Sequence, residues 1–110
     1  ARMWGQIEQS RALIYESLGM ADRLIVTGDT SLAAETKMLI STSKYTTCEM
    51  AIDVAKQCVW LHGGLGIVEE TGISRYLRDA QTLSIADGTP DLHIESVAFL
   101  LGMPSSQLTI

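Results

Sequence analysis

The chain has 110 residues, which suits one small domain. Its formal net charge is −5 and its eight Lys and Arg residues are scattered, which argues against nucleic-acid binding and a polybasic membrane patch. Apolar residues make up 46% of the chain, yet no stretch approaches the ~20 consecutive apolar residues that span a bilayer. We therefore expect one globular domain over residues 1–110, with neither a nucleic-acid partner nor a membrane span.

Two long helices are predicted over residues 3–26 and 31–62, because apolar or small residues recur there in steps of three and four. Gly28 and Asp29 separate them, and Thr30 or Ser31 is the expected N-cap of the second. Small residues are frequent on the second helix, which favours close helix packing. The expected inner faces carry Met3, Ile7, Ser10, Ile14, Leu18, Ala21 and Ile25, and then Ile40, Ser43, Thr47, Met50, Val54, Cys58 and Leu61.

A short helix is predicted over residues 73–82, and a fourth helix begins after Thr89 as N-cap with Pro90 in the first turn. Its apolar side carries Leu92, Val97, Leu100 and Leu101, and residues 104–110 are expected to form a loose tail. Two long helices joined by a short turn lie antiparallel, so we expect an all-α, up-down helical bundle. The chain begins within a helical pattern, so we expect a fragment that lacks the first helix of the bundle.

Cys48 and Cys58 lie ten residues apart on one predicted helix, so we expect two reduced, half-buried thiols. Neither cysteine has the spacing of a metal ligand, and no metal is expected. His62 is expected to pack at or cap a helix end.

A glycine-rich turn at residues 63–66 (GGLG) follows the second long helix. Glycines allow positive φ and let a ligand approach the backbone, but such a turn also simply ends a helix. No Gly-Lys-Ser/Thr follows it, which argues against a phosphate loop, and no strand precedes it, which argues against a dinucleotide fold.

Two further elements, an arginine pair and a turn with an aspartate, each allow a structural and a functional interpretation. Arg75 and Arg78 lie three residues apart, as in an exposed, salt-bridged helix or a cofactor-proximal arginine pair. Asp87 precedes Gly88 and the N-terminus of the fourth helix. Its carboxylate could stabilise the helix dipole or act as a general base, beside backbone N–H groups suited to an anion such as a diphosphate.

The order and spacing of these elements resemble the C-terminal helical domain of the acyl-CoA dehydrogenase family. That domain carries a GGxG turn, an RxxRDA helix and an I-x-E-G-T turn in this order, which match residues 63–66, 75–80 and 85–89. The resemblance implies a larger FAD-dependent enzyme of fatty acid metabolism that removes hydrogen from the α and β carbons of an acyl-CoA. This chain alone is then expected to be inactive.

The resemblance also implies roles for individual residues. Asp87 takes the place of the family's catalytic glutamate, which removes the α-proton, and Gly88 is expected at the substrate. Cofactor-binding residues are expected at Gly63, Gly64, Gly66 and Thr89. The glycine turn is expected to reach the FAD of a neighbouring subunit, so that both turns meet one shared flavin in a homo-oligomer, commonly a tetramer, which passes electrons to an electron-transfer flavoprotein-like acceptor.

Two departures from the family pattern leave alternatives open. Asp87 is one methylene shorter than the usual glutamate, which also suits nitroalkane oxidase-like or flavin monooxygenase chemistry on the same fold. Trp60 stands where the family often has a glutamine that contacts FAD. A third alternative is a non-catalytic helical interaction module. The family implies a cytoplasmic location for a bacterial protein and a mitochondrial one for a eukaryotic protein.

Overall fold

The computed structural model describes residues 1–104, and over this range it consists of α-helices joined by short turns. The helices are α1 (Arg2–Thr27), α2 (Ala33–Leu61), α3 (Ile73–Ile85) and α4 (Pro90–Leu100). Short 3-10 turns span Thr30–Leu32, Gly63–Gly66 and Glu69–Thr71. The all-α prediction is confirmed, and α3 continues three residues beyond its predicted end at 82. Most of the predicted tail, residues 105–110, lies outside the described part of the chain.

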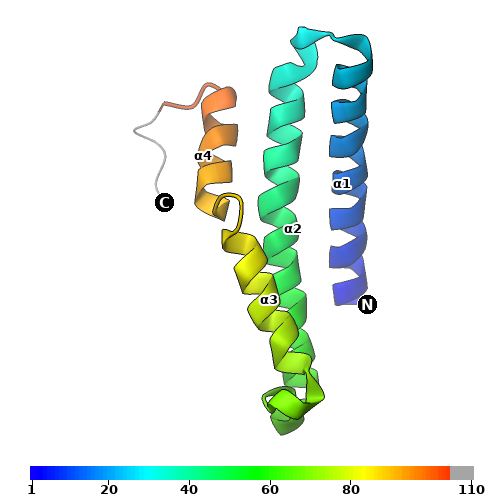
Figure 1. Cartoon of the computed structure of the whole chain (residues 1–110), viewed down its shortest axis with the longest axis vertical. Coiled ribbons are helices and arrows are strands. Elements are labelled where there is room, and N and C mark those ends of the chain that lie inside the picture. Colours follow the sequence, from blue (N-terminus) through cyan, green and yellow to red (C-terminus); the bar gives the residue numbers. More distant parts are fainter. Residues whose placement is uncertain (105–110) are drawn as a thin grey trace.

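The central element is α2, which packs against each of the other three helices. Figure 1 shows α1 antiparallel to α2 on one side, while α3 and α4 follow one another back along the other side. Together α3 and α4 therefore take the place of one long helix that is interrupted at residues 86–89. This is the predicted up-down arrangement, and it places one turn at the far end of α2 and another near the middle of the molecule (Figure 1).

The helix boundaries follow local chemistry. Gly28 ends α1 in the left-handed conformation at φ 64°, where its N–H donates to the Leu24 carbonyl. The predicted cap at Thr30 or Ser31 is wrong. The Asp29 carboxylate instead accepts hydrogen bonds from the N–H and hydroxyl of Ser31 at 3.0 and 2.6 Å, which delays the start of α2 to Ala33.

Small side chains form the contacts between helices. Ser17 on α1 meets Ser43 on α2 with their hydroxyl oxygens 3.4 Å apart, and each hydroxyl also donates to a carbonyl of its own helix. These short residues let the backbones approach closely while the Ser17 and Ser43 hydroxyls stay paired, whereas the buried hydroxyl of Thr47 on α2 has no hydrogen-bond partner within residues 1–104. The predicted close packing is confirmed. Apart from Gly66, the buried residues among those described are Ser10, Ser17, Met20, Thr36, Ser41, Ser43, Ala55, Ala80, Ser84 and Ala98.

The predicted inner faces are confirmed at their small residues Ser10 and Ser43, which are buried, but they are wrong at several large apolar positions. On α1, Leu18 is 55% and Ile25 is 78% exposed, while their neighbours Ser17 and Met20 are buried against α2. On α2, Ile40 and Leu61 are exposed as well. The reason is geometric, because α2 offers small residues that pair best with other small residues, so the larger side chains flank the contact. On α4, Leu92 and Leu101 are likewise exposed and Ala98 is buried.

None of the helices in residues 1–104 combines the length and the hydropathy that a membrane crossing requires.

Candidate functional site

The turn between α3 and α4 presents Asp87 in an unusual backbone conformation. Asp87 has φ 58°, which among residues 1–104 makes it the one non-glycine residue with positive φ. Gly88 follows at φ 100°. Aspartate tolerates the left-handed region better than most side chains, and glycine tolerates it freely. Asp87 is exposed, so its carboxylate is presented to the surroundings at the interruption between the two helices.

Contacts on both sides of the Asp87 turn hold it in place. After the turn, Nε2 of His93 lies 3.3 Å from the carbonyl oxygen of Asp87. Before the turn, Nζ of Lys44 on α2 donates to the carbonyl of Leu83 at 2.9 Å, which anchors the C-terminal end of α3. A cation at that end also interacts favourably with the helix dipole.

Lys44 lies beside one of the two thiols, since its Nζ is 3.5 Å from Sγ of Cys48. Cys48 and Cys58 are both half-buried and unbonded, as predicted.

The N-terminus of α4 follows the predicted pattern except for the cap itself. Thr89 is the N-cap with φ −70° and ψ 160°, and Pro90 occupies the first turn with Asp91. The side chain of Thr89, however, makes no capping hydrogen bond. The first-turn N–H groups of α4 therefore lack the side-chain acceptor that usually satisfies them, which is the situation in which a helix start accepts an anion.

The glycine turn forms a 3-10 turn directly after α2. Gly63 has φ 58°, and a β-carbon on Gly63 or Gly64 would meet no atom within 4 Å, so the backbone there is open to a ligand. Gly66 differs because it is buried against Val59. Nδ1 of His62 lies 2.7 Å from the carbonyl oxygen of Cys58, which agrees with its predicted place at the helix end.

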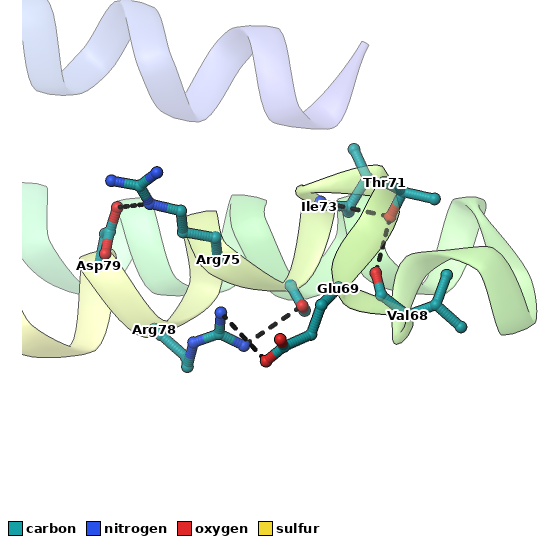
Figure 2. A network of polar contacts seen from close by, with 8 residues as sticks. Val68, Glu69, Thr71, Ile73, Arg75, Arg78 and Asp79 are labelled. Atoms are coloured by element: carbon teal, nitrogen blue, oxygen red, sulfur yellow. Dashed lines mark hydrogen bonds and ion pairs between the residues drawn. The ribbon is translucent and has the colours of Figure 1, made fainter.

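Thr71 fastens the segment between the glycine turn and α3. Its hydroxyl lies 2.7 Å from the carbonyl oxygen of Leu65 and 3.0 Å from that of Val68, and it accepts from the N–H of Ile73 at 3.4 Å. Figure 2 shows Thr71 between Val68 and Ile73, where the loop enters α3. One hydroxyl therefore joins the glycine turn to the start of the arginine helix.

The two arginines form exposed ion pairs. Nε of Arg75 lies 3.5 Å from a carboxylate oxygen of Asp79, and Arg78 lies 3.9 Å from Glu69. Nη1 of Arg78 also donates to the hydroxyl of Ser74 at 3.3 Å. Figure 2 shows the two guanidinium groups on different sides of α3. Of the two interpretations left open, the structure displays the exposed, salt-bridged helix.

The structure does not bring the glycine turn and Asp87 into one site within a single chain. They lie at opposite ends of α3, whose 13 residues span about 20 Å at 1.5 Å per residue (Figure 1). Both turns flank α3, the helix that carries Arg75 and Arg78, as predicted. A single ligand that touches both must span the length of α3, or else the two turns serve ligands in different copies of the chain.

Two open pockets flank the contact between α1 and α2. One, of about 500 Å³, is an almost wholly apolar groove between α1, α2 and α3. The other, of about 450 Å³, lies between α1 and α2 and is lined by both polar and apolar side chains. At this second pocket, a carboxylate oxygen of Asp53 accepts from Gln6 at 2.6 Å and from Gln57 at 2.9 Å. Asp87 lines neither of them. Within residues 1–104, His, Cys, Asp and Glu form no cluster able to hold a metal ion.

Sequence reasoning did not find Lys44, Thr71 or His93. Lys44 and Leu83 are 39 positions apart, and no local pattern links them. Thr71 acts through a loop contact without any periodicity. His93 could have been found, because it follows Thr89 by four positions and so lies one helical turn above the cap.

Comparison with known proteins decides the family. The family model described as "Acyl-CoA dehydrogenase, C-terminal domain" matches residues 1–101. The chain belongs to the acyl-CoA dehydrogenase family.

Curated relatives agree with this assignment. A 3-methylmercaptopropionyl-CoA dehydrogenase of Ruegeria pomeroyi is 37% identical over 92 residues, which are 80% of this chain and 16% of the relative. A short/branched chain specific acyl-CoA dehydrogenase from mitochondria of Bos taurus is 29% identical over 98 residues, 89% of this chain and 21% of the relative. An (R)-benzylsuccinyl-CoA dehydrogenase of Thauera aromatica is 30% identical over 93 residues, 84% of this chain and 21% of the relative.

The chain therefore spans about a fifth or less of the length of these relatives. No solved structure matches it.

Proposed function

We propose that this chain is the C-terminal part of an FAD-dependent acyl-CoA dehydrogenase in which Asp87 is the base that removes the α-proton of the acyl thioester. The observation that carries the proposal is the exposed carboxylate of Asp87, held on a turn of fixed backbone shape directly before α4. The relatives from Ruegeria pomeroyi and Thauera aromatica are named as dehydrogenases of acyl-CoA compounds, which supports an acyl-CoA as the substrate class.

Several backbone features of the chain fit the proposed cofactor. At Gly63 and Gly64 no side chain covers the backbone, and Gly63 has a positive φ. The first turn of α4 lacks a side-chain cap at Thr89, which leaves N–H groups for a phosphate oxygen. These two places would hold different FAD molecules, or different ends of one, because α3 separates them.

The proposed chemistry follows from the position of Asp87. Its carboxylate takes the proton from the α-carbon, and the electrons of that C–H bond form the new double bond between the α and β carbons. FAD, when bound, would supply the acceptor for the hydride that leaves the β-carbon. Gly88 directly follows this carboxylate in the chain and is proposed to lie at the substrate.

A homo-oligomer, commonly a tetramer in this family, is part of the proposal. It is supported by the large apolar side chains that the isolated chain leaves exposed, such as Trp4, Ile25 and Phe99. Exposed apolar surface on this scale is typical of interfaces. We further propose that the assembled protein passes electrons to an acceptor that resembles electron-transfer flavoprotein.

The proposal is tested by Asp87→Asn in the complete protein, followed by anaerobic mixing with acyl-CoA. The variant should keep its FAD yet lose the bleaching of flavin absorbance by substrate. Asp22→Asn is a suitable control, because it removes an exposed carboxylate from α1 without touching the turn. Bleaching at the wild-type rate in Asp87→Asn would remove this residue from the mechanism.

The alternatives give different outcomes in the same set of measurements. Oxygen consumption with a nitroalkane or another substrate without CoA would support oxidase or monooxygenase chemistry, to which an aspartate base is suited. A complete protein that carries no flavin would instead support a helical interaction module without catalysis.

A further inference from the structure

We propose that His93 is a positioning residue that holds the Asp87 turn in its strained shape by donating a hydrogen bond to the carbonyl oxygen of Asp87. This inference rests on the proposed function of Asp87 as the base. It concerns a different residue and a different interaction, so it can fail on its own.

The first support is the strain in the turn itself. Asp87 and Gly88 both have positive φ, at 58° and 100°. Aspartate adopts this region more readily than most residues, but the conformation is uncommon outside glycine, so contacts around the turn help to maintain it. The side chain of Thr89, the residue placed to fix the turn as an N-cap, makes no capping hydrogen bond. Another group therefore has to hold the turn.

The second support is the contact made by the His93 ring. Nε2 lies 3.3 Å from the Asp87 carbonyl oxygen. A carbonyl oxygen only accepts hydrogen bonds, so Nε2 carries the proton and Nδ1 faces away. The ring is half-buried. It extends from α4 to the turn between α3 and α4, where it contacts the residue proposed as base.

The third support is the shape of Gly88. A β-carbon there would lie 3.0 Å from Nε2 of His93, closer than ordinary van der Waals contact. The absence of a side chain at Gly88 is therefore what allows the imidazole to approach the Asp87 carbonyl. The position of the His93 ring thus depends on glycine at residue 88, and the ring in turn contacts the backbone of Asp87.

A base must be held within a small distance of the carbon that it deprotonates, and a misplacement of 1 Å can reduce the rate by about 100-fold. Loss of the His93 contact should therefore slow proton removal while substrate and cofactor still bind. Restoring an N–H donor of similar reach should restore the rate.

The experiment compares His93→Leu with His93→Gln in the complete protein, with or without Asp87→Asn. The rate constant of flavin reduction at saturating acyl-CoA should fall by about 10- to 100-fold in the Leu variant and largely recover in the Gln variant. FAD content and the Kd for substrate should change by no more than about twofold. The isotope effect with α-deuterated substrate should rise in the Leu variant, because proton removal limits the rate more completely. In the Asp87→Asn background, the Leu substitution should cause no further loss, as expected when one residue acts through the other.

Each other outcome overturns a specific statement. An unchanged reduction rate in His93→Leu, together with loss of reduction in Asp87→Asn, rejects the role of His93 and leaves that of Asp87 intact. Loss of FAD or of the fold in both His93 variants, with no recovery by Gln, shows a merely structural role. Wild-type reduction in Asp87→Asn rejects the proposed function itself. Crystal structures of the two His93 variants add a test without turnover, because only Leu should let φ of residue 87 leave the left-handed region.

Discussion

Gly66 lies directly against the peptide carbonyl of Val59, and a β-carbon added at Gly66 would collide with the carbonyl oxygen and lie 3.0 Å from the carbonyl carbon. Both atoms belong to backbone, so neither can move away as the end of a side chain would. The glycine turn is thus folded back onto the last turns of α2 at a distance that only glycine permits.

Substituting Gly66 should therefore destabilise the turn, whereas its neighbour should tolerate the same change. We expect Gly66→Ala to lower the free energy of unfolding by about 1–3 kcal/mol, the usual cost of inserting a methyl group into filled space. Gly64→Ala is the matched control, because a β-carbon there meets no atom within 4 Å. Thermal unfolding of both variants tests this, and equal melting temperatures would contradict it.

Removing the Thr71 hydroxyl should loosen the loop between the glycine turn and α3. Thr71→Val keeps the shape but removes the contacts to the carbonyls of Leu65 and Val68, at an expected cost of about 0.5–1.5 kcal/mol. Hydrogen exchange of amides 65–73 should accelerate in the Val variant. Thr71→Ser retains the hydroxyl and should exchange at nearly the wild-type rate, so a Ser variant as fast as Val would contradict this role.

Asp29 should make stability depend on pH in the acid range. Hydrogen bonds from the hydroxyl and then the N–H of Ser31 lower the pKa of the Asp29 carboxyl below its ordinary value. A lowered folded-state pKa means that the stabilisation is complete above the unfolded pKa of about 3.9 and is lost as the pH falls through the folded pKa.

We therefore expect Asp29→Ala to lower the melting temperature at pH 7, and the difference from wild type to shrink below about pH 4. Melting curves measured between neutral and acid pH test this expectation. A difference that stays constant down to the lowest accessible pH would show that the carboxylate is not what caps this turn.

The backbone at Asp87 should select among side chains independently of catalysis. Asn tolerates φ near +60° about as well as Asp, whereas a β-branched residue does not. We expect Asp87→Asn to melt within about 0.5 kcal/mol of wild type and Asp87→Val to lose roughly 1–2 kcal/mol. Unfolding measurements on the two variants would show this, and a Val variant as stable as Asn would argue against the positive φ at this position.

Helix identity could be predicted from the sequence, because Gly28 and the Thr89-Pro90 pair carry strong local signals for an end and a start. Helix boundaries differ from the prediction where a side chain bonds to the backbone of a turn. Asp29 forms such a cap in place of Thr30 or Ser31, and α2 begins at Ala33. No glycine or proline marks the end of α3 before Asp87, so the sequence carries no local signal for it. The predicted end at residue 82 is therefore three residues too early.

The packing faces could be predicted only in part. Ser10 and Ser43 lie on the predicted inner faces and are buried, whereas Leu18 and Ile25 are exposed. An apolar stripe shows that a surface will be covered, but it does not show which helix covers it, and Ser17, which meets Ser43, was not on the predicted face. The Asp87 and glycine turns were found because their motifs are local. Their separation along α3 was hidden, because distance along a helix becomes distance in space only once the fold is known.

The seam of serine, threonine and alanine along α2 has a thermodynamic consequence. Small side chains remove little hydrocarbon from water, so the helices gain little hydrophobic free energy from one another. Most of what stabilises these helices must come from whatever covers the larger side chains. If copies of the same protein provide that cover, mass action links folding to association, and the midpoint of heat denaturation will climb as the protein is concentrated.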